Sequence, residues 1–100
     1  MILHSVTVNI DKTLELEWLQ WMKNVHIPEI MATGLPMGNK ILKLLTEIDN
    51  EGTTFSCQYY FQTMEDYFTY DKLHAKEFQD KHHVRFLNRY VSFRTLLEEV

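Results

Sequence analysis

The sequence predicts an α+β domain in which strands and helices alternate along a chain of 100 residues. Residues 2–10 and 53–62 alternate between two sets of side chains with the period of two that is typical of strands. Residues 14–25 instead repeat large apolar side chains at helical spacing. Proline, glycine and clusters of acidic and amide residues separate these segments. The order that results is strand, helix, strand, strand, helix, strand.

The first strand, residues 2–10, presents two different faces. His4, Val6, Val8 and Ile10 alternate with Ser5, Thr7 and Asn9. Asp11 or Thr13 is placed to cap the helix that follows, because short oxygen-bearing side chains accept hydrogen bonds from exposed amides at a helix start. The apolar stripe of this helix consists of Leu14, Trp18, Trp21, Met22 and Val25.

The first helix is expected to break near its end, within residues 26–34. Pro28 has no amide hydrogen to donate, and its ring disfavours helical angles at Ile27. Gly34 then ends the helical region. Such a break leaves backbone carbonyls free beside His26 and Glu29, which favours a polar site there.

The second half of the chain begins with two strands, at residues 40–48 and 53–62. The segment Asp49 to Gly52 predicts the hairpin turn between them. On the later strand, Phe55, Cys57 and Tyr59 share an inward face, and Cys57 is interpreted as a packed thiol.

The second helix and the last strand follow. Thr63, with an acidic residue two and three positions later, predicts the helix start. The helix end falls somewhere in residues 80–88, with Asn88 or Arg89 marking the break, and residues 90–97 predict the last strand.

This order predicts a ferredoxin-like βαββαβ sandwich, with a four-stranded antiparallel sheet and both helices on one face. The other face of the sheet is expected to be open and partly apolar. A contiguous apolar face on a small domain indicates a partner, and a homodimer that packs sheet against sheet is the simplest one. The open face is predicted to carry Leu3, Ile41, Leu45, Tyr60, Tyr90 and Leu96.

Length and charge bound the class of protein. Residues 1–100 form one domain, and a net charge of −4 without a cluster of lysine or arginine argues against nucleic-acid binding. No apolar run approaches the roughly 20 residues that span a membrane, and the start lacks a signal-peptide core. A single cysteine excludes an internal disulfide, so we expect a cytoplasmic protein without a membrane partner.

Four segments resemble a family of bacterial proteins of about 100 residues and unknown function. They are Val6 to Ile10, Trp18 to Lys23, His26 to Gly34 and Phe93 to Glu98. That family is similar to the dimeric α/β-barrel superfamily, so the resemblance implies this fold and a homodimer. It implies no reaction, because one fold hosts many chemistries. No catalytic motif of the haem-degrading or monooxygenase branches matches residue by residue, and no cofactor is expected.

Counting along the elements locates a site in the cleft between helices and sheet. From Asp11 to His26 the helix rises about 22 Å, and from Ile10 back to His4 the strand extends about 20 Å. His4 and His26 are therefore expected at one mouth of the cleft, with His74 at the same end and Glu29 beside them. Trp18 and Trp21 are interpreted as core residues that also line the cleft.

Three interpretations of these side chains stay open. They are structural histidines that find partners in the fold, or His26 is an acid/base group that titrates near neutral pH and is oriented by Glu29 or His4. In the third, imidazoles hold a metal or haem, although no metal-ligand spacing supports it. The pair His82 and His83 is expected to lie on a solvated face.

Two functions follow from these interpretations. In one, the dimer is an enzyme or a binding protein for a hydrophobic small molecule, with His26 at the mouth of the cleft. In the other, it is a non-enzymatic dimer whose own aromatic side chains fill the cleft. Three scattered glycines exclude a phosphate loop.

Overall fold

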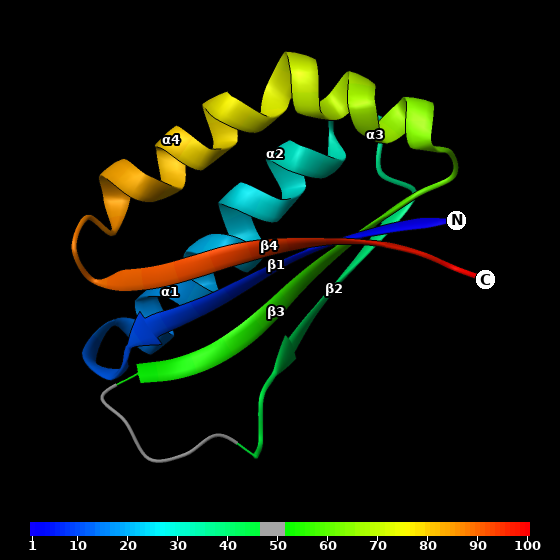
Figure 1. The fold of residues 1–100 in the computed structure, drawn as a ribbon. Coiled ribbons are helices and arrows are strands. Elements are labelled where there is room, and N and C mark those ends of the chain that lie inside the picture. The colour runs from blue at the N-terminus through cyan, green and yellow to red at the C-terminus, as the bar shows by residue number, and fades with distance from the viewer. Residues whose placement is uncertain (47–51) are drawn as a thin grey trace.

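A computed structural model describes residues 1–46 and 52–100 of the chain, shown in Figure 1. The expected order of elements is confirmed, although each long helix is divided into shorter segments. The strands are β1 (Ile2–Asp11), β2 (Gly38–Lys43), β3 (Gly52–Phe61) and β4 (Tyr90–Glu98). The first long helix comprises η1 (Lys12–Leu14), α1 (Glu15–Trp21), η2 (Met22–His26) and α2 (Ile27–Met31). The second comprises α3 (Met64–Tyr70), η3 (Asp71–Ala75) and α4 (Lys76–Arg85).

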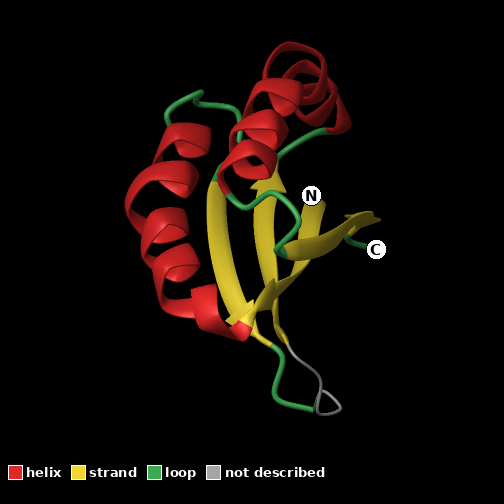
Figure 2. Ribbon diagram, turned by 90° about the vertical axis from the view of Figure 1, so that its left-hand side faces the viewer, coloured by secondary structure: helices red, strands yellow, loops and turns green. Residues whose placement is uncertain are grey.

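The four strands form one antiparallel sheet in the order β2-β3-β1-β4. Because β1 lies between β3 and β4, His4 has Tyr59 on one side and Leu96 on the other. Figure 2 shows the helices gathered on one side of the sheet, so its other face is uncovered. This arrangement confirms the ferredoxin-like sandwich that the sequence predicts.

The core lies between the helices and the sheet. The inward faces expected for β1 and β3 are confirmed, since Val8, Phe55 and Cys57 are buried there. The largest fully buried side chains bring together both helices and the two central strands. They are Trp18, Phe61, Phe86, Ile10, Val8 and Cys57.

The outer strands differ from the expectation. Tyr90 and Leu96 pair with inward-facing residues of β1, and Ile41 pairs with Cys57, so these three face the helices and not the open side. Their assignment to the open face was wrong, whereas Leu3 and Tyr60 do lie on it. Leu45 follows the end of β2 and is exposed. On β4 the open face carries Val91, Phe93, Thr95 and Leu97.

The second strand is also shorter than expected. It ends at Lys43, and the amide of Leu44 still donates to the carbonyl of Thr54 at 2.9 Å. Residues 44–46 are not part of the strand. The expected continuation through residues 47–48 and the turn at residues 49–51 lie outside the described residues.

The break near Pro28 is present, but it takes a different form from the one predicted. Ile27 is helical, with φ −62° and ψ −45°, so the expected departure from helical angles was wrong. The irregular turn lies just before it: Met22–His26 is π-helical, and the amide of Ile27 donates to the carbonyl of Met22. A wider turn of this kind accommodates the missing amide of Pro28 without ending the helix. The chain then leaves the helix at Gly34, whose φ of 77° is left-handed.

The second long helix starts as predicted, because the side chain of Thr63 accepts a hydrogen bond from the amide of Asp66 at 3.1 Å. It also contains a π-helical turn, Asp71–Ala75, and continues to Arg85. Asn88, with a φ of 63°, marks the break before β4. No helix in the described part of the chain is long and apolar enough to cross a membrane.

Candidate functional site

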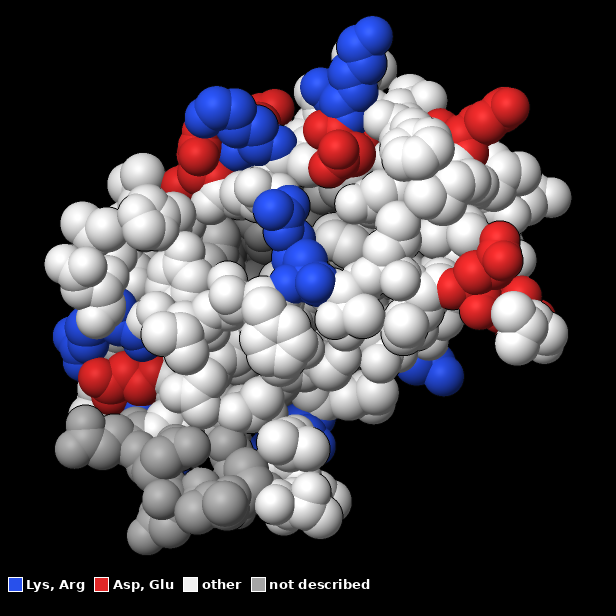
Figure 3. Space-filling model, viewed as in Figure 1, with Lys and Arg blue, Asp and Glu red and all other residues white. Residues whose placement is uncertain are grey.

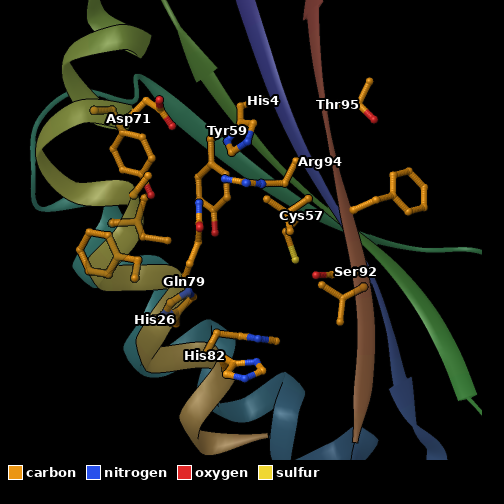
Figure 4. Close-up of a pocket in the computed structure, with 18 of the residues that line it drawn as sticks. His4, His26, Cys57, Tyr59, Asp71, Gln79, His82, Ser92, Arg94 and Thr95 are labelled. Atoms are coloured by element: carbon orange, nitrogen blue, oxygen red, sulfur yellow. The ribbon is translucent and has the colours of Figure 1, made fainter. Parts of the chain in front are cut away.

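A cavity of about 740 Å³ lies between the helices and the sheet, close to the edge strand β4. Figure 3 shows it as a hollow on the face that Figure 1 presents, with a basic side chain at its rim. Its walls are partly apolar, from Val6, Val8, Met22, Ile30 and Phe78. Its polar lining includes His4, His26, His82, Tyr59, Asp71, Gln79, Ser92 and Arg94, all of which are labelled in Figure 4.

Both π-helical turns border this cavity. The turn Met22–His26 contributes both its first and last residues to the lining, and the turn Asp71–Ala75 does the same. Single π-helical turns inside α-helices frequently occur at functional sites, because the extra residue redirects side chains. The two irregular turns therefore direct side chains from both helices toward one space.

His26 lies at the cavity as predicted, and its side chain is 6% exposed. Its ring stacks on Trp21 at 4.5 Å between centroids, and no described residue bonds its Nδ1 atom. Burial lowers its pKa to about 4, and the neighbouring His82 lowers it further. This lowered pKa keeps the ring uncharged at pH 7, so it does not favour the interpretation in which His26 titrates near neutral pH.

His4 lines the same cavity from the middle of the sheet, so the predicted convergence of His4 and His26 is found. It is 5% exposed, and neither ring nitrogen has a hydrogen-bond partner among the described residues. Burial lowers its pKa to about 4, Arg94 lowers it further, and Asp71 opposes the shift. A buried polar group usually has a partner, so two free nitrogens on one ring indicate a place for a ligand or water.

His82 is the site residue that the sequence analysis missed. It is 8% exposed, so the expectation of a solvated face was wrong for His82, although it holds for His83. Its Nε2 atom accepts a hydrogen bond from the indole of Trp18 at 2.9 Å, so in the neutral ring the proton is on Nδ1. Burial lowers its pKa to about 4. Its position four residues from both Phe78 and Phe86 was the signal that placed it on the buried stripe.

The other expected site residues lie around the cavity and do not line it. Glu29 is exposed, and its carboxylate accepts from the ammonium of Lys81 at 2.9 Å. The negative charge of Glu29 acts on His26 only through space: it raises the pKa of His26, but burial has a larger effect in the opposite direction. His74 is half-buried against the rings of Tyr70 and Phe78. Trp18 is fully buried below His82.

Charged groups at the cavity are few. Asp80 is paired with Lys76 at 2.8 Å, whereas neither Arg94 nor Asp71 forms an ion pair with a described residue. The thiol of Cys57 also lines the cavity, and burial raises its pKa to about 12. Among the described residues no group of three or more histidine, cysteine or acidic side chains could hold a metal ion. The lining can donate and accept hydrogen bonds to an uncharged or singly charged molecule.

These features define the class of protein: a ferredoxin-like α+β domain with an open, histidine-lined cavity between helices and sheet. The chain belongs to the family of DUF4286 domains, described as a domain of unknown function, which matches residues 1–100. The resemblance to a family of unknown function is thereby confirmed. No curated protein matches the chain in sequence.

Solved structures share the fold at low sequence identity. HapK from Hahella chejuensis is 8% identical with a TM-score of 0.70, over 100% of this chain and 93% of that chain. An ethyl tert-butyl ether d (EthD) family protein from Bacillus halodurans is 12% identical with a TM-score of 0.72, over 100% of both chains. A dimeric ferredoxin-like protein from an uncultured marine organism is 13% identical with a TM-score of 0.64, over 99% of this chain and 97% of that chain.

Proposed function

We propose that this protein binds a hydrophobic small molecule in the cavity between its helices and sheet, and that it does so as a homodimer. The observation that carries this proposal is the pair of buried imidazoles, His4 and His26, which line one open cavity and have ring nitrogens without a hydrogen-bond partner among the described residues. Ligand sites typically have volumes of about 300–1,000 Å³ and combine apolar walls with convergent polar groups, and this cavity has both the volume and the mixed lining.

The alternative function, a dimer with a filled cleft, required the aromatic side chains to occupy this space. Trp18 and Phe55 instead pack on each other at 4.9 Å between ring centroids, as part of the buried core. Trp21 stacks on His26 without entering the lining. A cavity of about 740 Å³ is left, which favours the ligand-binding function.

Within this function, His26 is the group proposed to act on the ligand. A neutral imidazole can accept a proton or form a hydrogen bond, and the ring is held flat against Trp21. Its low pKa makes it a weak base, so a hydrogen-bonding role suits it better than proton transfer at neutral pH. Glu29 contributes only by its charge, because Lys81 occupies its carboxylate.

A neutral probe tests this function without relying on charge. We propose to titrate the protein with 4-phenylbutanamide and to follow the imidazole and amide signals by NMR. Binding in the cavity should shift the signals of His4, His26 and Cys57, and His26→Gln should weaken it severalfold. His74→Gln is the matched control, since His74 is a half-buried imidazole on the second long helix that does not line the cavity. Shifts confined to other surfaces, or none at all at millimolar probe, would contradict the proposed function.

The homodimer is proposed from the open face of the sheet. Val91 and Phe93 are 70% and 63% exposed there, beside the half-exposed Leu97. Leu3 and Tyr60 extend the same face across the central strands. A contiguous apolar face of this kind supports burial against a second copy, because a self-complementary surface closes on a twofold axis. The ferredoxin-like protein from an uncultured marine organism, which is similar in fold, is dimeric.

Light scattering at micromolar concentration tests the assembly. The native chain should have twice the mass of one chain, and Phe93→Glu should give the mass of one. Val84→Glu is the matched control, because Val84 is equally exposed but lies on α4, away from the sheet face. A folded monomer of the native chain would contradict the proposal.

A further inference from the structure

We propose that the cavity selects monocarboxylic acids with an apolar body, and that Arg94 of β4 binds the carboxylate. This inference rests on the proposed function, because it names the class of ligand that the same cavity takes. It depends on the placement of Arg94, on the free nitrogens of His4, and on the charges that surround them.

Arg94 is placed to reach into the cavity from the edge strand. Its backbone pairs with Val6, one of the cavity-lining residues of β1, so it lies on the helix-facing side of the sheet. Leu96, two residues further along this face, pairs with His4. Figure 4 shows the Arg94 side chain directed into the cavity beside His4 and Tyr59, whereas Thr95 points to the other side of the strand.

The guanidinium of Arg94 makes no hydrogen bond, ion pair or ring contact with a described residue, whereas each of the two other arginines has such a partner. Arg89 donates to the carboxylate of Asp11 at 2.9 Å and 3.0 Å. Arg85 lies over the ring of Trp21 at 5.5 Å from its centroid. Arg94 acts on its neighbours only through its charge, on His4 and the tyrosines of the second helix. All of its donors therefore remain for a ligand.

A carboxylate matches these donors. The planar guanidinium presents two parallel N–H groups at the spacing of two carboxylate oxygens, and such pairs combine charge with hydrogen-bond geometry. The buried ring of His4 lies next to it with both nitrogens unpartnered, so its N–H can donate to one ligand oxygen as well. Met22, Ile30 and Phe78 supply the apolar walls for the rest of the ligand.

Asp71 limits the charge that the cavity accepts. It lines the cavity from the π-helical turn of the second helix, and it acts on His4 in the opposite sense to Arg94. The other lining carboxylate, Asp80, is paired with Lys76. One unpaired guanidinium facing one unpaired carboxylate favours a singly charged ligand, because a doubly charged phosphate would meet Asp71 without a second cation.

Two probes of the same shape test this inference. The affinities of 4-phenylbutanoate and 4-phenylbutanamide for the folded protein are compared at pH 7.5 by NMR titration. We expect the carboxylate to bind about tenfold tighter, since one charge-assisted pair is worth on the order of that factor. Arg94→Gln should remove the difference, and Arg94→Lys should keep only part of it. Asp71→Asn should increase it severalfold, because the opposing charge is lost.

The control is Arg85→Gln, which removes an arginine that does not line the cavity and should leave the difference unchanged. If the amide binds in the cavity as tightly as the carboxylate, or if the preference survives in Arg94→Gln, this inference fails while the proposed function stands. If neither probe binds in the cavity, both fail. A tighter binding of inorganic phosphate than of 4-phenylbutanoate would overturn the limit set by Asp71.

Discussion

The indole N–H of Trp18 donates a hydrogen bond to Nε2 of His82 over 2.9 Å, and it joins α1 to α4 across 64 residues of sequence. Trp18 is fully buried and His82 nearly so. A buried N–H that meets a buried ring nitrogen satisfies both groups and fixes which nitrogen of the imidazole carries the proton. Through this bond the core of the domain orients one of the polar groups of the cavity.

Trp18→Phe should therefore destabilise the protein and alter His82. The substitution keeps an aromatic ring but leaves Nε2 of His82 without a donor, so we expect a loss of about 1–3 kcal/mol in the free energy of unfolding. In ¹⁵N NMR spectra of the imidazoles, the native His82 should show the form protonated at Nδ1, and the variant should show a mixture. Trp21→Phe is the control, because Trp21 contacts His82 only by its ring. An unchanged His82 spectrum in Trp18→Phe would contradict the assignment.

The order of strands and helices could be predicted from the sequence because each element carries a clear local pattern. The strict alternation of β1 and β3 and the caps at Asp11 and Thr63 depend only on neighbouring residues. The cavity histidines His4 and His26 were found by counting along these elements, since rise per residue is nearly constant. His82 was missed because adjacent histidines were treated as a pair and not as separate positions on the helix.

The phase of β4 could not be predicted from the same rule. Val91, Phe93 and Leu97 are the more apolar side of this strand, and an apolar side normally faces the core. Here the polar residues Ser92 and Arg94 face the helices, because they line a cavity and not a packed interior. This edge strand lines a cavity with one face and forms an open apolar surface with the other. The rule that the apolar side of a strand faces the core therefore assigns its two faces the wrong way round.

The three buried histidines should make stability depend on pH. The pKa values of His4, His26 and His82 are lowered from 6.5 to about 4, so between these values the unfolded chain binds more protons than the native one. Their contribution to stability is complete above pH 6.5 and is lost as the pH falls toward 4. Each imidazole should lower the free energy of unfolding by about 1–2 kcal/mol when the pH falls from 7 to 5.

Urea unfolding at pH 7 and pH 5 measures this loss. His26→Gln should reduce the pH dependence by about one third. Asp11 does not add to the stability change between pH 7 and pH 5, because its hydrogen bonds to Thr13 and Arg89 lower its pKa to about 2. Equal stability of the native chain at the two pH values would show that the imidazoles titrate as in the unfolded state.

The thiol of Cys57 should be nearly inert in the folded protein. Burial raises its pKa to about 12, so at pH 8 the thiolate is about a thousand times rarer than for a free cysteine. A disulfide reagent such as dithionitrobenzoate should therefore modify the native chain slowly and the urea-unfolded chain within seconds. Rapid modification of the native chain would mean that the cavity wall opens often enough to expose the sulfur.

Asn88 should control how β4 enters the sheet. It lies between α4 and β4 with a φ of 63°, a left-handed conformation that costs most side chains about 1–2 kcal/mol and that asparagine and glycine tolerate. Asn88→Gly should keep the stability within about 0.5 kcal/mol, and Asn88→Val should lose about 1–2 kcal/mol in urea unfolding. The next residue, Arg89, pairs with Asp11 and directly precedes β4, the strand whose alternation places Arg94 toward His4. If this turn sets the phase of β4, the valine variant should also show altered NMR signals for Arg94, and a variant with native stability and native signals would remove Asn88 from that role.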